Sequence, residues 1–135
     1  METLVGADRA FGSVVAGVDG SHAALNAVRW ATAEAVTHGV TLRLIHAVAA
    51  SQVCHSDSDA VLAHAEKAAE SESGSVVVDT VRAVGTPGEV LLAASRRAAM
   101  VCIGIRAAQS RNGPVIGPVA ALLSREAACP VAVIR

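Results

Sequence analysis

The chain has 135 residues, 53% of them hydrophobic, and a formal net charge of −1. That length suits one domain around one core, and the near-neutral charge offers no basic surface to nucleic acid. Aromatic residues make up only 1% of the chain, so the stacking platforms of single-strand binders are lacking. No apolar run approaches the roughly 18 residues of a membrane-spanning helix. We therefore expect neither a nucleic-acid partner nor a membrane partner.

The beginning of the chain and its cysteines indicate the compartment. Residues 1–12 are expected to form a flexible lead-in. They lack the basic start and the long apolar core of a signal peptide, so we expect none. The cysteines are odd in number, three in all, and Cys102 and Cys129 stand in apolar segments that favour small core residues. We expect a cytoplasmic protein with a single domain over residues 13–135.

Short apolar segments alternate with helical patterns along the rest of the chain. Ser21 can cap a first helix that Gly39 would end, and Pro87 can open a later one. The predicted strands are 13–18, 40–48, 76–84, 99–105 and 130–135. The predicted helices run from Ser21 to Gly39, from about Asp57 to Ser73, from Pro87 onward and over 118–127.

This alternation predicts an α/β fold, with parallel strands and helices on both faces. Right-handed crossovers restrict it to a doubly wound, three-layer sheet. Ligands of such sheets bind beyond the carboxyl ends of the strands. The turn Asp19-Gly20-Ser21 and the loop from Gly104 to Gly117 are therefore the candidate site.

The loop after the fourth predicted strand outlines a phosphate site. An apolar run ends at Gly104, and Gly117 precedes a helical pattern, where free backbone N–H groups can meet an anion. A structural interpretation stays open, since glycines also punctuate ordinary strand–loop and loop–helix junctions. Asp19 is likewise either a ligand contact or a turn residue, and Arg106 and Arg111 either hold an anion or are solvated.

Other kinds of site find little support in the residues. One cluster of potential metal ligands matches no zinc spacing, namely Cys54, His55, Asp57, Asp59 and His64. We expect no metal site. The dinucleotide fingerprint, a Walker lysine and a Ser-His-Asp or Cys-His set are missing, so we expect no enzyme. His46 follows an apolar strand and is expected to be partly buried and hydrogen-bonded, and Trp30 is expected to pack on the first helix.

Several segments together resemble the universal stress protein family. Residues 14–21 read Val-Val-Ala-Gly-Val-Asp-Gly-Ser, similar to the opening strand and turn of that family. Residues 42–48 resemble its second strand, which ends in His and small apolar residues. Residues 85–87 are similar to its Gly-x-Pro turn, and residues 129–135 to its Cys-Pro-Val-x-Val-x-Arg ending, with Arg135 one place early. The resemblance covers nearly the whole predicted domain.

The resemblance implies a Rossmann-like fold with five parallel strands in the order 3-2-1-4-5. It also implies homodimers built on the last strand, here through Val131, Val133 and Ile134. The family's role lies in stress survival or signalling rather than in a known reaction. The resemblance therefore implies a non-catalytic stress-response protein with a signalling protein as a further partner.

Many members of the family bind ATP through a Gly-x2-Gly-x9-Gly-Ser/Thr pattern. On this chain the first and third glycines are Gly104 and Gly117, but Ala107 stands at the second and Pro118 at the Ser/Thr position. Ala107 adds a Cβ where glycine lets a backbone come close, and Pro118 lacks a hydroxyl and an N–H. Each lost hydrogen bond to a charged group costs about 1.5–3 kcal/mol, so we expect ATP binding to be weakened roughly a hundredfold or lost.

Two interpretations of this site follow. In the first the ATP site is degenerate, with ATP as a weak cofactor at most. In the second the chain is a functional ATP-binding sensor or switch with residual slow ATPase activity. Asp19 retains the place of the family's nucleotide-contacting Asp, and Ala47 can offer backbone groups to adenine. The candidate nucleotide contacts are Gly17, Val18, Asp19, Ala47, Gly104, Arg106, Gly113, Gly117, Pro118 and Val119.

Overall fold

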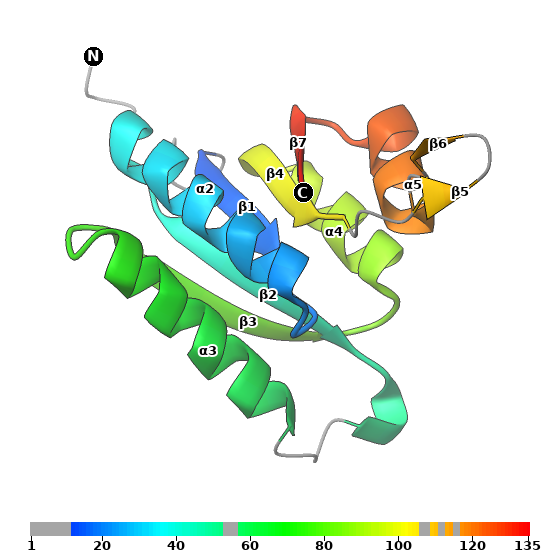
Figure 1. Ribbon diagram of the computed structural model, residues 1–135, viewed down its shortest axis with the longest axis horizontal. Helices are drawn as coiled ribbons and strands as arrows, with labels where there is room; N and C mark the ends of the chain where they lie inside the picture. The colour runs from blue at the N-terminus through cyan, green and yellow to red at the C-terminus, as the bar shows by residue number, and fades with distance from the viewer. Residues whose placement is uncertain (1–11, 53–56, 106–108, 111–112, 115–116) are drawn as a thin grey trace.

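A sheet of five parallel strands forms the centre of the structure. The computed structural model describes residues 12–52, 57–105, 109–110, 113–114 and 117–135. The strands are β1 (Ser13–Gly17), β2 (Leu42–Val48), β3 (Val78–Val84), β4 (Ala98–Gly104) and β7 (Val131–Ile134). Across the sheet they follow the order β3-β2-β1-β4-β7 (Figure 1). The predicted order 3-2-1-4-5 and the parallel direction are confirmed.

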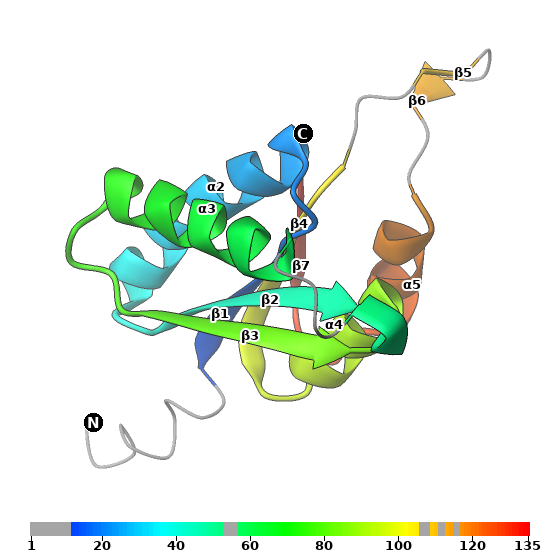
Figure 2. The ribbon, with the colours of Figure 1, turned by 90° about the horizontal axis from the view of Figure 1, so that it is seen from below.

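The described helices cover both faces of the sheet. They are α2 (His22–His38), α3 (Asp57–Glu72), α4 (Pro87–Ser95) and α5 (Pro118–Glu126). Figure 2 shows α2 and α3 on one face and α4 and α5 on the other. Successive strand residues point to opposite faces, so Val14 and Ala16 join the core under α2 and α3 while Val15 joins the core under α4. The three-layer α/β architecture predicted from the alternation is confirmed.

Local signals in the sequence explain where these helices begin and end. The Ser21 side chain accepts a hydrogen bond from the Ala24 N–H at 3.1 Å, which caps α2. Gly39 ends that helix in a left-handed conformation with φ of 66°. Thr86 and Glu89 form a capping box at the start of α4, next to Pro87. The cap predicted at Ser21, the helix end predicted at Gly39 and the helix start predicted at Pro87 are therefore confirmed.

Some predicted boundaries and burials were wrong. Strand β3 begins at Val78 rather than at 76, and the predicted loop regions contain a 3-10 turn, η2 (Ala50–Gln52), and a hairpin of β5 (Gln109–Ser110) with β6 (Gly113–Pro114). Elements of two or three residues are too short to leave a periodic pattern. Cys102 is buried as expected, but Cys129 is only partly buried.

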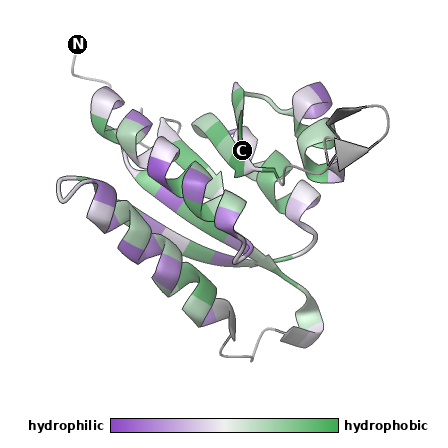
Figure 3. Ribbon diagram, viewed as in Figure 1, coloured by the Kyte–Doolittle hydropathy of each residue, from purple (hydrophilic) through white to green (hydrophobic). Residues whose placement is uncertain are grey.

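Trp30 was expected to pack on the first helix, yet 38% of it is exposed. It follows Asn26 by one helical turn, and the Asn26 amide donates to the Arg135 carbonyl oxygen at 3.4 Å. This face of α2 therefore lies beside the end of β7, an outer strand of the sheet. Figure 3 shows the apolar residues gathered on the central strands and the polar residues along the outer helix surfaces. Among the described residues, no helix combines the length and apolarity that crossing a membrane requires.

Candidate functional site

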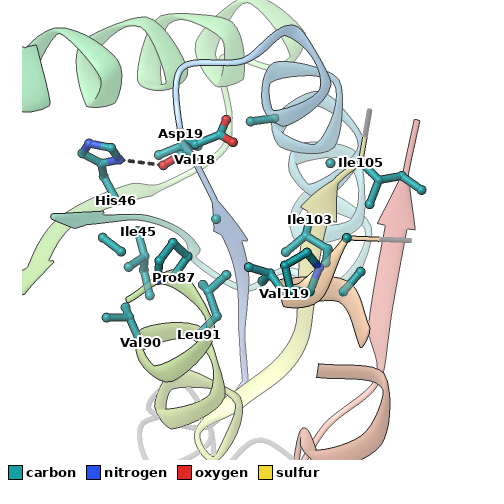
Figure 4. Close-up of a pocket in the computed structure, with 17 residues that line it drawn as sticks. Val18, Asp19, Ile45, His46, Pro87, Val90, Leu91, Ile103, Ile105 and Val119 are labelled. Atoms are coloured by element: carbon teal, nitrogen blue, oxygen red, sulfur yellow. Dashed lines mark hydrogen bonds between the residues drawn. The ribbon is translucent and has the colours of Figure 1, made fainter. Parts of the chain in front are cut away.

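A cavity of about 370 Å³ opens at the carboxyl ends of β1, β2 and β4 (Figure 4). From β1 the chain adds β2 and β3 on one side and β4 and β7 on the other. Doubly wound sheets bind their ligands at this point, where the direction of strand addition changes. Most of the residues predicted as contacts line it together: Gly17, Val18, Asp19, Ala47, Gly104, Gly117, Pro118 and Val119. Of the other two, Gly113 lies in β6 of the hairpin, and Arg106 lies outside the described residues.

The walls of this cavity are mostly apolar. Ile45, Val90 and Leu91 face Ile103 and Val119 across it (Figure 4). Such walls suit a flat, weakly polar ring more than a charged group, because burying an unpaired charge is costly.

Asp19 brings a carboxylate to the rim of the cavity. One of its oxygens accepts the N–H of Ser21 at 2.9 Å, which shapes the turn after β1. The side chain is exposed, and its carboxylate makes no other hydrogen bond or ion pair among the described residues. The second oxygen can therefore accept hydrogen bonds from a ligand's hydroxyl groups. The two interpretations of Asp19, turn residue and ligand contact, are compatible.

The N-terminus of α5 supplies the donors of the site. Gly117 stands at the N-cap position with no side-chain cap, whereas Ser21 and Thr86 cap α2 and α4. Pro118 occupies the first helical position and has no N–H. The N–H groups of Val119 and Ala120 remain at the edge of the cavity, where the helix dipole favours an anion.

The glycines at the site serve different purposes. A Cβ on Gly104 would overlap the backbone carbonyl of Ala23, and a Cβ on Gly17 would lie 2.7 Å from Leu91 Cδ1. The packing of α2 on the sheet therefore requires glycine at Gly104, where the obstacle is backbone, whereas the Leu91 side chain can move aside at Gly17. Gly117 has ordinary extended torsions, and among the described residues no atom lies within 4 Å of an added Cβ. The fold itself does not require glycine at Gly117, so the open space there is available to a ligand.

Several wall residues were missed by the sequence analysis. They are Ala24, Ile45, His46, Pro87, Val90, Leu91, Ile103, Ile105 and Ala120. The position of Ile45, His46, Ile103 and Ile105 at strand carboxyl ends was a usable signal. In the part of the chain that the structure describes, no three His, Cys, Asp or Glu side chains gather as a metal would need.

A sequence model described as the universal stress protein family matches residues 10–135 of this chain. The chain belongs to the universal stress protein family. Universal stress protein Rv2624c of Mycobacterium tuberculosis is 36% identical over 130 residues, which cover 91% of this chain and 48% of that protein. Universal stress protein Rv3134c of the same organism is 38% identical over 130 residues, with the same coverage. This chain thus spans about half the length of these relatives.

Solved structures of universal stress proteins share the fold. A universal stress protein in complex with cAMP superposes with a TM-score of 0.78 at 24% identity, covering 93% of this chain and 98% of that one. One from Archaeoglobus fulgidus in complex with dAMP gives a TM-score of 0.75 at 24% identity, with the same coverage. One from Arabidopsis thaliana with AMP bound gives 0.66 at 18% identity, covering 91% and 90%.

Proposed function

We propose that this universal stress protein is a non-catalytic stress-response protein whose pocket holds an adenine nucleoside and gains little from a triphosphate. The single observation that carries this proposal is the cavity at the carboxyl ends of β1, β2 and β4. It combines apolar walls, the free carboxylate oxygen of Asp19 and the uncapped start of α5. The apolar walls suit the adenine ring, the Asp19 oxygen suits the sugar hydroxyls, and the start of α5 suits a phosphate.

The pocket offers fewer hydrogen-bond donors to a phosphate than the family's ATP pattern does. Pro118 leaves Val119 and Ala120 as the backbone donors of the first turn of α5, and it brings no hydroxyl. Ala107, which lies outside the described residues, replaces the second glycine of the family pattern. Two lost hydrogen bonds to a charged group correspond to roughly a hundredfold in affinity or more. The bound relatives named above carry cAMP, dAMP and AMP, each with one phosphate, which supports a ligand of this class.

The described pocket residues give little basis for catalysis. Asp19 and His46 are the titratable side chains among those that line the cavity, and Nδ1 of His46 already bonds the Val18 carbonyl oxygen at 2.7 Å. No hydroxyl or thiol side chain stands beside them as a nucleophile among the described lining residues. A second candidate is an ATP-binding switch with slow ATPase activity, favoured by the uncapped α5 and the open space at Gly117. Nucleotide turnover above a buffer blank would favour this second candidate.

The outer strand β7 is the proposed dimer contact. Its outer edge pairs with no other strand among the described residues, and natural sheets cover or protect such edges. Val133 is 37% exposed there. The exposed Trp30 lies on the neighbouring face of α2. We extend the proposal to a cytoplasmic homodimer formed through Val131, Val133 and Ile134, with a signalling protein as a further partner.

Calorimetric titration with adenosine tests the proposal. We expect saturable binding of one adenosine per chain. A chain that binds neither adenosine nor AMP would overturn the nucleoside assignment. Native mass spectrometry of freshly purified protein would report the oligomer mass and any co-purifying nucleotide in the same spectrum.

A further inference from the structure

The β1–β2 ladder stops one hydrogen bond early, just where the pocket begins. In a parallel ladder the N–H and C=O of one residue both face the same neighbouring strand, and the next residue faces the other one. The Val18 N–H donates to the Ile45 carbonyl oxygen at 2.9 Å. A continuing ladder would next bond the Ala47 N–H to the Val18 carbonyl oxygen. That bond is not formed, and β1 ends at Gly17.

A side chain takes the place of the missing bond. Nδ1 of His46 lies 2.7 Å from the Val18 carbonyl oxygen (Figure 4). A carbonyl oxygen only accepts hydrogen bonds, so Nδ1 carries the hydrogen and donates it. The imidazole thereby occupies the acceptor that the Ala47 N–H would otherwise use.

The result is a free peptide edge on the pocket wall. Ala47 lines the cavity, and its N–H and C=O face the side on which β1 has ended. A donor and an acceptor side by side match the edge of a six-membered ring that carries an acceptor nitrogen next to an amino group. Adenine presents such an edge, whereas hypoxanthine presents an N–H beside a carbonyl oxygen, the opposite pattern.

We propose that His46 is a positioning residue for base recognition: it holds the Val18 carbonyl and keeps the Ala47 peptide groups open to the base. This inference rests on the proposed function, because it deepens the assignment of the same pocket. His46 does not need to touch the ligand. If His46 only satisfied the hydrogen-bonding need of the partly buried Val18 carbonyl, its loss would lower stability without changing which base is bound.

The first measurement needs no variant and no ligand. In the unaltered protein we expect the Ala47 amide to exchange with solvent faster than the amide of Ile45, which lies inside the β1–β2 ladder. Added adenosine should protect the Ala47 amide. An Ala47 amide as protected as that of Ile45 in the free protein would overturn the proposal. If adenosine does not bind at all, the proposed function fails, while the exchange rate in the free protein still decides whether Ala47 is open.

Variants separate positioning from stability. His46→Asn keeps an N–H near the place of Nδ1, and His46→Leu removes it. We expect His46→Leu to lower the preference for adenosine over inosine about tenfold, the worth of roughly one hydrogen bond, and to slow exchange of the Ala47 amide. His46→Asn should preserve both. His22→Leu, on an exposed residue of α2 that is not among the described lining residues, is the matched control. A base preference that is unchanged in folded His46→Leu would contradict the inference.

Discussion

Gly104 at the end of β4 packs directly against the backbone carbonyl of Ala23 in the first turn of α2. The contact is so close that a Cβ on Gly104 would overlap that carbonyl, and backbone atoms cannot move aside as a flexible side chain can. The first glycine of the family's ATP pattern is therefore needed by the fold, whether or not a nucleotide is bound.

This relationship predicts opposite outcomes for two glycines of the same loop. Gly104→Ala should lower the free energy of unfolding by about 3 kcal/mol, because a side chain is forced into a packed site. Gly117→Ala should change it by less than about 0.5 kcal/mol, yet weaken AMP binding more than adenosine binding, because its Cβ enters the open space at the phosphate end of the pocket. Urea denaturation and calorimetry check the pair. Equal stability losses in both variants would contradict this assignment.

Asp19 can be tested through its second carboxylate oxygen. Asp19→Asn retains an oxygen for the Ser21 N–H but replaces the other acceptor with an amide donor. We expect about tenfold weaker binding of adenosine and nearly unchanged binding of 2′,3′-dideoxyadenosine, which lacks the ribose hydroxyls. The unfolding free energy should stay within about 0.5 kcal/mol. Equal losses for both ligands would remove Asp19 from the sugar site.

The two outer strands of the sheet allow a controlled test of the dimer. Val133→Lys places a charge on the edge strand β7 and should give a monomer by analytical ultracentrifugation. Val77→Lys, next to the opposite edge strand β3 at a residue that is 66% exposed, should leave the dimer intact. Trp30 is the single tryptophan, so its fluorescence should shift to the red when Val133→Lys dissociates the dimer. Dissociation by Val77→Lys instead would move the contact to β3.

The buried thiol of Cys102 predicts a loss of stability at alkaline pH. Burial, with smaller contributions from Glu34 and Cys129, raises the pKa of Cys102 from 9.0 to about 12. Since the folded pKa is the higher one, the stabilisation is complete below the unfolded pKa and declines as the pH rises toward the folded one. Between about pH 8 and about pH 10.5, the free energy of unfolding of the wild-type chain should fall by about 2 kcal/mol more than that of Cys102→Ala.

Cys129→Ala is the control for that experiment. Burial raises the pKa of Cys129 as well, but a backbone hydrogen bond with Val101 acts in the opposite direction. Its removal should change the alkaline slope less than the removal of Cys102 does. A wild-type slope equal to that of Cys102→Ala would show that this thiol does not control the alkaline stability.

Much of the fold was predictable because its signals are local. Ser21, Gly39 and Pro87 act within one helical turn of their own position, so the sequence shows the beginning or end of each helix directly. The strand order came from the resemblance to the family. Burial at the edge of the sheet was less predictable, since nothing near Trp30 in the sequence shows that its helix face borders an outer strand.

Site residues could be predicted from the sequence only where they stand at the end of a strand or the start of a helix. Asp19 and Gly117 follow or precede regular elements and were found. Val90 and Leu91 were missed, because an apolar helix residue that faces a cavity has the same sequence pattern as one that faces the core. The role of Gly104 required the position of Ala23, which is distant in the sequence. The hydrogen bond between His46 and the Val18 carbonyl oxygen likewise could be found only from the structure.

The contribution of the phosphates to affinity tests the central claim most directly. Calorimetric titration of the wild-type chain with adenosine, AMP and ATP should give ATP an advantage over adenosine of no more than about tenfold. In the double variant Ala107→Gly with Pro118→Ser, that advantage should rise roughly a hundredfold while adenosine affinity stays the same. Micromolar ATP binding by the wild-type chain, far tighter than its adenosine binding, would contradict the account.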